Sequence, residues 1–204
     1  MKAREIVLAG GAGGIGSAVL DLLYAEGLQG ERPSLVASFR ANAARAEESR
    51  RRAEIVQADI TIAADRTRLL DAAPYLYGLV VLAGDPARPS PEIPIEETMR
   101  RSHEVNYLGP LLLAREAAER MKAAAQPGAI VLVSTMQAVA LFPGSTAYAA
   151  PKAALIHAAR ILAKEMRGSN IRVNVVSPGV TAAGMARESI ASGKYDRLDR
   201  KSVV

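Results

Sequence analysis

The stretch REIVLAGGAGGIGSAVLDLLYAEG, residues 4–27, carries the strongest signal for the fold of this chain. REIVLA is an apolar run typical of a short strand, GGAGGIG is rich in glycine, and the residues after it have the pattern of a helix. Strand, glycine turn and helix in this order are the context in which a glycine motif binds phosphate. Gly10, Gly14 and Gly16 would let a pyrophosphate approach the backbone and the free N–H groups at the start of the helix. A flexible glycine loop without a ligand is the alternative interpretation.

Apolar runs and helical patterns alternate along the rest of the chain. This alternation predicts an α/β fold with a doubly wound parallel sheet, Rossmann-like, in three α/β/α layers with about six strands. Runs such as GLVVLAG and AIVLVST are almost wholly apolar, as expected for strands that are buried on both faces. We predict strands at residues 4–9, 34–39, 54–57, 78–83, 129–134 and 171–176, and helices at 15–26, 41–52, 64–72, 96–124 and 146–167.

The segment YAAPK places Tyr148 and Lys152 four residues apart, which is about one turn of a helix. An ammonium about 5 Å from a phenol, at an effective dielectric constant of about 20, would lower the pKa of the phenol from ~10 by about two units. Pro151 is tolerated in a first helical turn, so we expect the helix to begin near residues 147–150 or to bend there. The alternatives are a surface pair on an amphipathic helix, or two residues outside one regular helix.

The glycine spacing G-x3-G-x-G, together with Tyr148-x3-Lys152, resembles the short-chain dehydrogenase/reductase family, and within it the 3-oxoacyl-ACP reductase-like members. The resemblance runs from residue 4 to about residue 181. It implies an NADP(H)-dependent oxidoreductase that reversibly transfers a hydride between nicotinamide and a carbonyl or alcohol substrate. Tyr148 would be its acid/base, and Lys152 would lower the pKa of that phenol and hold the cofactor ribose.

The resemblance assigns further residues to the site. Asn106 would hold a water in a proton relay. The family's serine usually lies 13 residues before the tyrosine, where this chain has Thr135, so we expect Thr135 to donate a hydrogen bond to the substrate oxygen, with Ser134 as the alternative. Besides Tyr148 and Lys152, the expected cofactor contacts are Gly10, Gly14, Ile15, Gly16, Arg40, Asp59, Ile60, Ala83, Gly84, Pro178, Gly179, Val180 and Thr181.

The chain departs from the family at three positions that brace the sheet. Ala9 stands where the family usually has threonine, and Val81 and Leu82 stand where it usually has two asparagines. These side chains mainly support the sheet, so their loss concerns local stability more than chemistry.

The end of the second predicted strand bears on the choice of cofactor. An acidic residue there would bind the ribose 2′-hydroxyl of NAD. This chain has Phe39 at that position and Arg40 next to it, and an arginine can pair with a 2′-phosphate, so we expect NADP(H) to be preferred with NAD(H) possible. The segment 27–33 lengthens the connection into this strand and leaves a solvated loop cation as the alternative interpretation of Arg40.

Composition narrows the classes of partner. The chain has no cysteine, hence neither a disulfide framework nor a thiolate metal site. No apolar run reaches the ~20 residues of a membrane span, and the first one is too short for a signal peptide. The net charge is +5, with one basic cluster at Arg45, Arg50, Arg51 and Arg52 and a second at Lys194 to Lys201. Acidic residues interrupt both clusters and no aromatic platform accompanies them, so we interpret them as a solvated helix face and expect no nucleic-acid partner. We expect a cytoplasmic protein with a small-molecule carbonyl or alcohol substrate, and the resemblance implies a homo-oligomer, dimer or tetramer.

The domain organisation is predicted as one dinucleotide-binding domain at residues 1–181 that contains the catalytic residues, followed by a short polar tail at 182–204. Family members usually continue further with a substrate-covering lid, so the chain is either a fragment or a form without these elements. The short tail and Thr135 leave a second hypothesis open, a non-catalytic or impaired NADP(H)-binding sensor or interaction protein. The proline-rich segment 84–94 should form a loop that helps to wall the ligand site.

Overall fold

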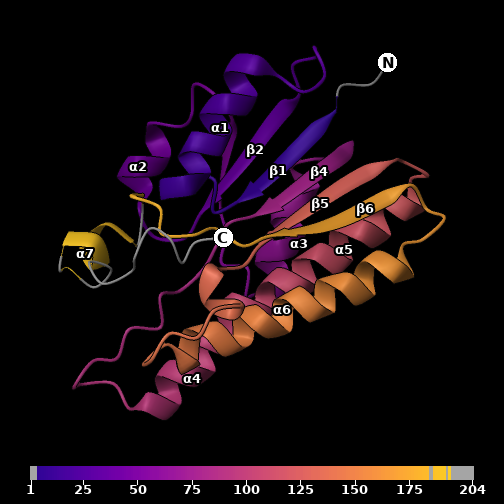
Figure 1. Cartoon of the computed structure of the whole chain (residues 1–204). Helices are drawn as coiled ribbons and strands as arrows, with labels where there is room; N and C mark the ends of the chain where they lie inside the picture. Colours follow the sequence, from indigo (N-terminus) through magenta and orange to yellow (C-terminus); the bar gives the residue numbers. More distant parts are fainter. Residues whose placement is uncertain (1–3, 184–185, 192, 194–204) are drawn as a thin grey trace.

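The computed structural model describes residues 4–183, 186–191 and 193 and confirms the predicted doubly wound parallel sheet (Figure 1). All strand pairs run parallel, in the order β3-β2-β1-β4-β5-β6. The strands are β1 (Glu5–Ala9), β2 (Ser34–Phe39), β3 (Glu54–Gln57), β4 (Leu76–Val81), β5 (Gly128–Val133) and β6 (Ile171–Val176). The helices are α1 (Gly14–Glu26), α2 (Ala43–Glu47), α3 (Ala63–Asp71), α4 (Ile95–His103), α5 (Gly109–Ala123), α6 (Thr146–Glu165) and α7 (Ala186–Ala191), with a π-helical turn η1 (Glu104–Leu108) and a 3-10 turn η2 (Met136–Ala138).

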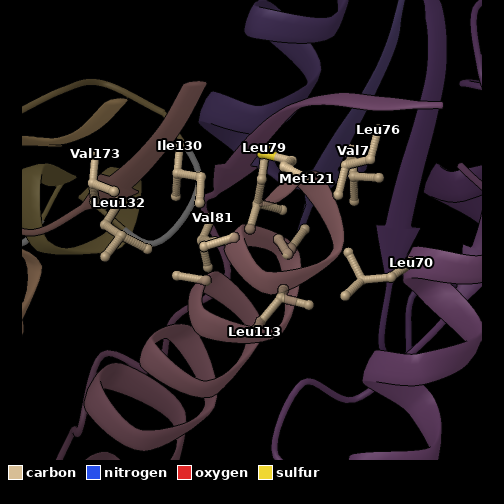
Figure 2. Packing of buried hydrophobic residues seen from close by; sticks show 14 of the residues in the cluster. Val7, Leu70, Leu76, Leu79, Val81, Leu113, Met121, Ile130, Leu132 and Val173 are labelled. Carbon is tan, nitrogen blue, oxygen red and sulfur yellow. The ribbon is translucent and has the colours of Figure 1, made fainter. Parts of the chain in front are cut away.

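Helices cover the sheet on two faces (Figure 1). α3, α5 and α6 pack on one face, where Leu113 and Met121 of α5 meet Leu79 and Val81 of β4 (Figure 2). α1 lies on the other face and buries Leu20 in a smaller cluster with residues of β1 and β2. Strands buried on both faces explain why the predicted runs are almost continuously apolar.

The strand order reverses between β1 and β4, and a crevice opens there beyond the carboxyl ends of the strands. The Ala9 carbonyl accepts the backbone N–H groups of Leu82 at 2.8 Å and Ala83 at 3.0 Å. Ala9, Val81 and Leu82 carry no polar side chain, so backbone hydrogen bonds join β1 and β4 at this edge. The crevice therefore begins where the hydrogen-bonded ends of β1 and β4 lie side by side.

Two glycines make the turn after β1 possible. Gly10 has φ +81, and a Cβ there would lie 2.8 Å from the Ala83 nitrogen. Gly16 lies in α1, where a Cβ would overlap the Gly10 carbonyl oxygen and lie 2.8 Å from the Gly11 Cα. The start of α1 can approach the end of β1 only because both side chains are absent.

Two helix predictions need correction. The helix expected at 96–124 is continuous, but η1 interrupts its α-helical pattern, and Gly109 N–H bonds to the Glu104 carbonyl five residues back. The helix expected at 41–52 is only α2. After it, Ser49, Arg50 and Arg52 donate their N–H groups to carbonyls three residues back, which is a tighter winding than the α-helix.

α6 carries both Tyr148 and Lys152 in one helix, and Pro151 lies within it. The predicted helix at 146–167 is confirmed as Thr146–Glu165. It begins one residue before the start near 147–150 that Pro151 suggested, and it continues through the proline.

The tail predicted at 182–204 contains the short helix α7, which the sequence analysis did not expect. Residues 194–204 lie outside the described part of the chain, and so does the second basic cluster. The division into a domain and a tail stays a prediction.

Gly16→Ala should lower the free energy of unfolding by about 1–3 kcal/mol, because the added methyl group has no room against the Gly10 carbonyl. Helix propensity alone would favour alanine by about 1 kcal/mol, so the two effects have opposite signs. Urea unfolding measures the outcome. Ala18→Gly, at an exposed position of the same helix, reports propensity alone, and a higher urea midpoint for Gly16→Ala would refute the packing argument.

Candidate active site

A cavity of about 550 Å³ lies over the carboxyl edge of the sheet. The glycine turn, the ends of β2 to β5, the start of α6 and the segment after β6 line it. It brings together every predicted site residue except Asn106, namely Gly10, Gly14, Ile15, Gly16, Arg40, Asp59, Ile60, Ala83, Gly84, Ser134, Thr135, Tyr148, Lys152, Pro178, Gly179, Val180 and Thr181.

Ser38 holds the glycine turn in place. Its hydroxyl, on a residue with 2% exposure, accepts the Gly10 N–H at 3.0 Å. The Ser38 side chain thus satisfies a backbone donor that the turn removes from the sheet ladder. Sequence analysis did not single out this residue, because one serine within an apolar strand carries no motif.

Asp59 follows β3 and lies at the wall of the cavity. Its Oδ1 accepts the N–H of Thr61 at 3.0 Å and the Thr61 hydroxyl at 2.7 Å. Its own N–H donates to Asp65 Oδ2 at 2.8 Å. This backbone hydrogen bond, aided by Arg68, keeps the pKa of the Asp65 carboxyl below its ordinary value. The loop after β3 is therefore held by local bonds on both sides of Asp59.

The end of β2 supplies positive charge to the cavity. Arg40 and Arg45 both line it. Asn42 lies between them and caps α2, since its Oδ1 accepts the Arg45 N–H at 3.0 Å. The sequence analysis treated Arg45 as part of a solvated helix face, because the sequence alone does not show that the chain after β2 turns back over the crevice.

Lys152 is the most buried cation of the cavity wall, with 4% exposure. Its Nζ donates to the Val133 carbonyl at 2.9 Å. Burial lowers the pKa of Lys152 to about 8, because a low-dielectric surrounding disfavours the charged form. The Lys152 amine is therefore still mainly in its protonated form at pH 7.

Ser134 and Thr135 follow β5 and differ in how their hydroxyls are used. Ser134 Oγ donates to the Lys152 carbonyl at 3.0 Å, so its hydroxyl hydrogen is already bound to the backbone of α6. Thr135 Oγ1 accepts the Gln137 N–H at 3.3 Å, which leaves its hydrogen outside that bond. Both residues line the cavity. The arrangement favours Thr135 as the donor to a ligand, and its role stays a prediction.

Asn106 lies in η1 with 0% exposure and does not line the cavity. Its Nδ2 donates to the Asp85 carbonyl at 2.8 Å and to Ser102 Oγ at 2.9 Å, and its Oδ1 accepts the Asp85 N–H at 3.0 Å. Both amide hydrogens are thus in use. The side chain ties η1 to the loop after β4, a connection that the sequence did not indicate, and its role towards a water stays a prediction.

The loop at 84–94 walls the cavity as predicted, through Pro86, Ala87, Arg88 and Pro89. Ala87 has φ +49, and its N–H donates to Asp85 Oδ1 at 2.6 Å. Asp85 also pairs with Arg101 Nε at 2.9 Å. The carboxylate therefore stabilises an unfavourable backbone conformation at the cavity wall.

The same cavity is thus lined by the glycine turn, by Arg40 and Arg45 and by Tyr148 and Lys152 of α6. A family model described as short chain dehydrogenase matches residues 4–193. The chain belongs to the short-chain dehydrogenase family.

Alignments with relatives in this family cover different shares of this chain. An NADPH-dependent aldehyde reductase-like protein, chloroplastic, of Arabidopsis thaliana is 36% identical over 157 residues, which cover 74% of this chain and 56% of that protein. An uncharacterised oxidoreductase of Methylorubrum extorquens is 30% identical over 208 residues, covering 96% and 81%. A solved structure of a short chain dehydrogenase/reductase family protein has 30% identity and a TM-score of 0.80, and the match covers 93% of this chain and 80% of that chain. The chain thus spans just over half the length of the Arabidopsis relative, and the named relatives place it among the oxidoreductases of the family.

Among the described residues, no group of three or more histidine, cysteine, aspartate or glutamate side chains could hold a metal ion. No helix in the same part of the chain has the length and apolar character needed to cross a membrane.

Lys152→Met should change how stability depends on pH. The Lys152 pKa is about 8 in the folded protein and 10.5 in the unfolded chain, so between these values the unfolded chain binds more protons and the wild type gains stability as pH rises. The gain relative to Lys152→Met should approach about 3 kcal/mol between pH 8 and pH 10.5. Urea unfolding of both proteins across this range measures it, and a constant difference would contradict the lowered pKa.

Proposed function

We propose that the protein is an NADP(H)-dependent reductase of small carbonyl compounds, acting reversibly on the corresponding alcohols. One observation supports this most: α6 carries Tyr148 and the buried Lys152 on the wall of the same cavity that the glycine turn enters. A cavity that only bound a nucleotide would have no need for an acid-base pair at its far end.

The residues present fit a dinucleotide phosphate. The turn at Gly10 and Gly16 has no room for side chains and leaves backbone N–H groups at the start of α1 for a pyrophosphate. Arg40 and Arg45 offer two guanidinium groups for a 2′-phosphate, and the side chain at the preceding position, Phe39, is not acidic. When bound, the nicotinamide supplies or accepts the hydride.

The protein's own share of the reaction is proton transfer and orientation. Tyr148 would donate its phenolic proton to the carbonyl oxygen as the carbon is reduced. Thr135 would donate a hydrogen bond to the same oxygen. The Lys152 ammonium, protonated at neutral pH, would favour the phenolate that remains and hold the cofactor ribose.

Reprotonation of Tyr148 needs a path to solvent, and Asn106 would contribute to it through a water. Since both of its amide hydrogens are in use, Asn106 would bind that water through an oxygen.

The substrate is proposed as an aldehyde, a small ketone or a 3-oxoacyl group. The Arabidopsis relative is named as an aldehyde reductase-like protein. The segment after η2, which leads to cavity residues Gly144 and Ser145, exposes Val139 and Leu141 and would offer an apolar chain a surface beside the reacting carbon. A cytoplasmic location and a homo-oligomer are proposed with this function.

NADPH should raise the melting temperature more than NADH at equal concentration, because Arg40 and Arg45 can pair with the 2′-phosphate. Arg40→Ala and Arg45→Ala should each weaken NADPH binding by about 1.5–3 kcal/mol, the range for a hydrogen bond to a charged group, and leave NADH binding nearly unchanged. Thermal shift and direct titration measure both. Arg51→Ala, at an exposed position outside the cavity, is the matched control. Equal shifts from NADPH and NADH would remove the NADP(H) assignment.

Tyr148→Phe should lower the rate of NADPH oxidation about 10²–10⁴-fold with aldehydes, ketones or 3-oxoacyl thioesters, while NADPH binding persists. Tyr24→Phe, on an exposed residue of α1, should leave the rate unchanged. An unchanged rate in Tyr148→Phe would refute the acid role. NADPH binding without turnover of any carbonyl by the wild type would favour the alternative, a binding or sensor protein.

A further inference from the structure

Pro151 leaves a backbone carbonyl of α6 without its helical donor. In an α-helix the N–H of residue 151 would donate to the Ala147 carbonyl, four residues earlier. Proline has no N–H, and its ring crowds that same carbonyl. The affected carbonyl lies directly before Tyr148, so the gap falls on the turn that carries the proposed acid.

A side chain from another helix supplies the missing donor. Ser102 lies in α4 with 0% exposure, and its Oγ donates to the Ala147 carbonyl at 2.6 Å. The same Oγ accepts Asn106 Nδ2 at 2.9 Å. Because a serine hydroxyl has one hydrogen, the bond from Asn106 leaves that hydrogen free for Ala147. The bond from Asn106 therefore orients the Ser102 hydroxyl toward α6.

The bond acts on the peptide unit that precedes the Tyr148 side chain. The Ala147 carbonyl and the Tyr148 N–H belong to one planar unit. The Tyr148 N–H donates to the Ser145 carbonyl at 2.9 Å, and Ser102 binds the opposite end. Both ends of the unit are thus held, one by the N-cap residue of α6 and one by a side chain of α4.

We propose that Ser102 is a positioning residue, whose hydroxyl replaces the helical donor that Pro151 lacks and so holds Tyr148 against the cavity. Ser102 does not line the cavity and acts only through α6. The proposal rests on the proposed function, because that function gives Tyr148 its role as the acid.

A double-mutant cycle of Ser102→Ala and Pro151→Ala tests this. Ser102→Ala alone should lower kcat about tenfold or more, since small displacements of a reacting group have large effects, with KM for NADPH nearly unchanged. In the Pro151→Ala background a helical N–H is restored to the Ala147 carbonyl. There, Ser102→Ala should lower kcat less than about threefold, and it should shift the urea midpoint less than it does in the wild-type background.

The cycle separates two effects of the same substitution. Ser102→Ala also removes the acceptor of Asn106 Nδ2, but that loss is the same in both backgrounds and cancels. Thr98→Val is the matched control on α4, because Thr98 is fully buried and its Oγ1 has no hydrogen-bond partner among the described residues. It should show no coupling to Pro151→Ala.

Equal effects of Ser102→Ala in the two backgrounds would overturn the proposal, and so would a raised KM for NADPH with an unchanged kcat. If Ser102→Ala alone does not fold, Pro151→Ala must restore folding. If the wild type turns over no carbonyl, the proposed function fails. The double-mutant cycle measured by urea unfolding then still decides whether Ser102 and Pro151 are coupled. If they are not coupled, the proposed positioning role of Ser102 is overturned.

Discussion

The end of β5 and Lys152 are joined by two hydrogen bonds of opposite direction, and the rest of the site depends on this contact. Lys152 Nζ donates to the Val133 carbonyl, and Ser134 Oγ donates to the Lys152 carbonyl. A buried ammonium loses hydration and must find acceptors in the protein. The observed register of α6 against β5 provides one such acceptor, the Val133 carbonyl, and places Tyr148 and Lys152 at the cavity. Burial lowers the pKa of Lys152, which means that keeping this ammonium charged in the folded protein costs free energy of folding.

Around this contact, polar side chains bind backbone groups at two places beyond the ends of the strands. Ser38 accepts the Gly10 N–H, and Asn106 binds both backbone groups of Asp85. Ser102 in turn links Asn106 to α6. The apolar core below holds the layers together, but apolar contacts are not directional. The hydrogen bonds supply the direction that a catalytic site requires.

Charge is distributed unevenly along the cavity. Arg40 and Arg45 lie where β2 ends, and Lys152 lies where α6 begins. A dinucleotide in the proposed site would place its 2′-phosphate at the arginines, its pyrophosphate on the glycine turn and its nicotinamide near Tyr148. The protein would thus orient the cofactor by charge at one end and by hydrogen bonding at the other.

The sequence by itself determined the layer architecture, because apolar strand runs, helical periods and a glycine turn are local patterns that packing reinforces. It also identified the cavity residues Gly10, Tyr148 and Lys152, whose spacing within one turn or one helix is set by backbone geometry. Only the tertiary structure decided the parts that depend on distant segments. Ser38, Arg45 and Ser102 have no motif of their own. The π-helical turn and the continuation of α6 through Pro151 likewise depend on partners far away in the chain. Hydrogen bonds between residues that the fold alone brings together leave no period or spacing in a single sequence.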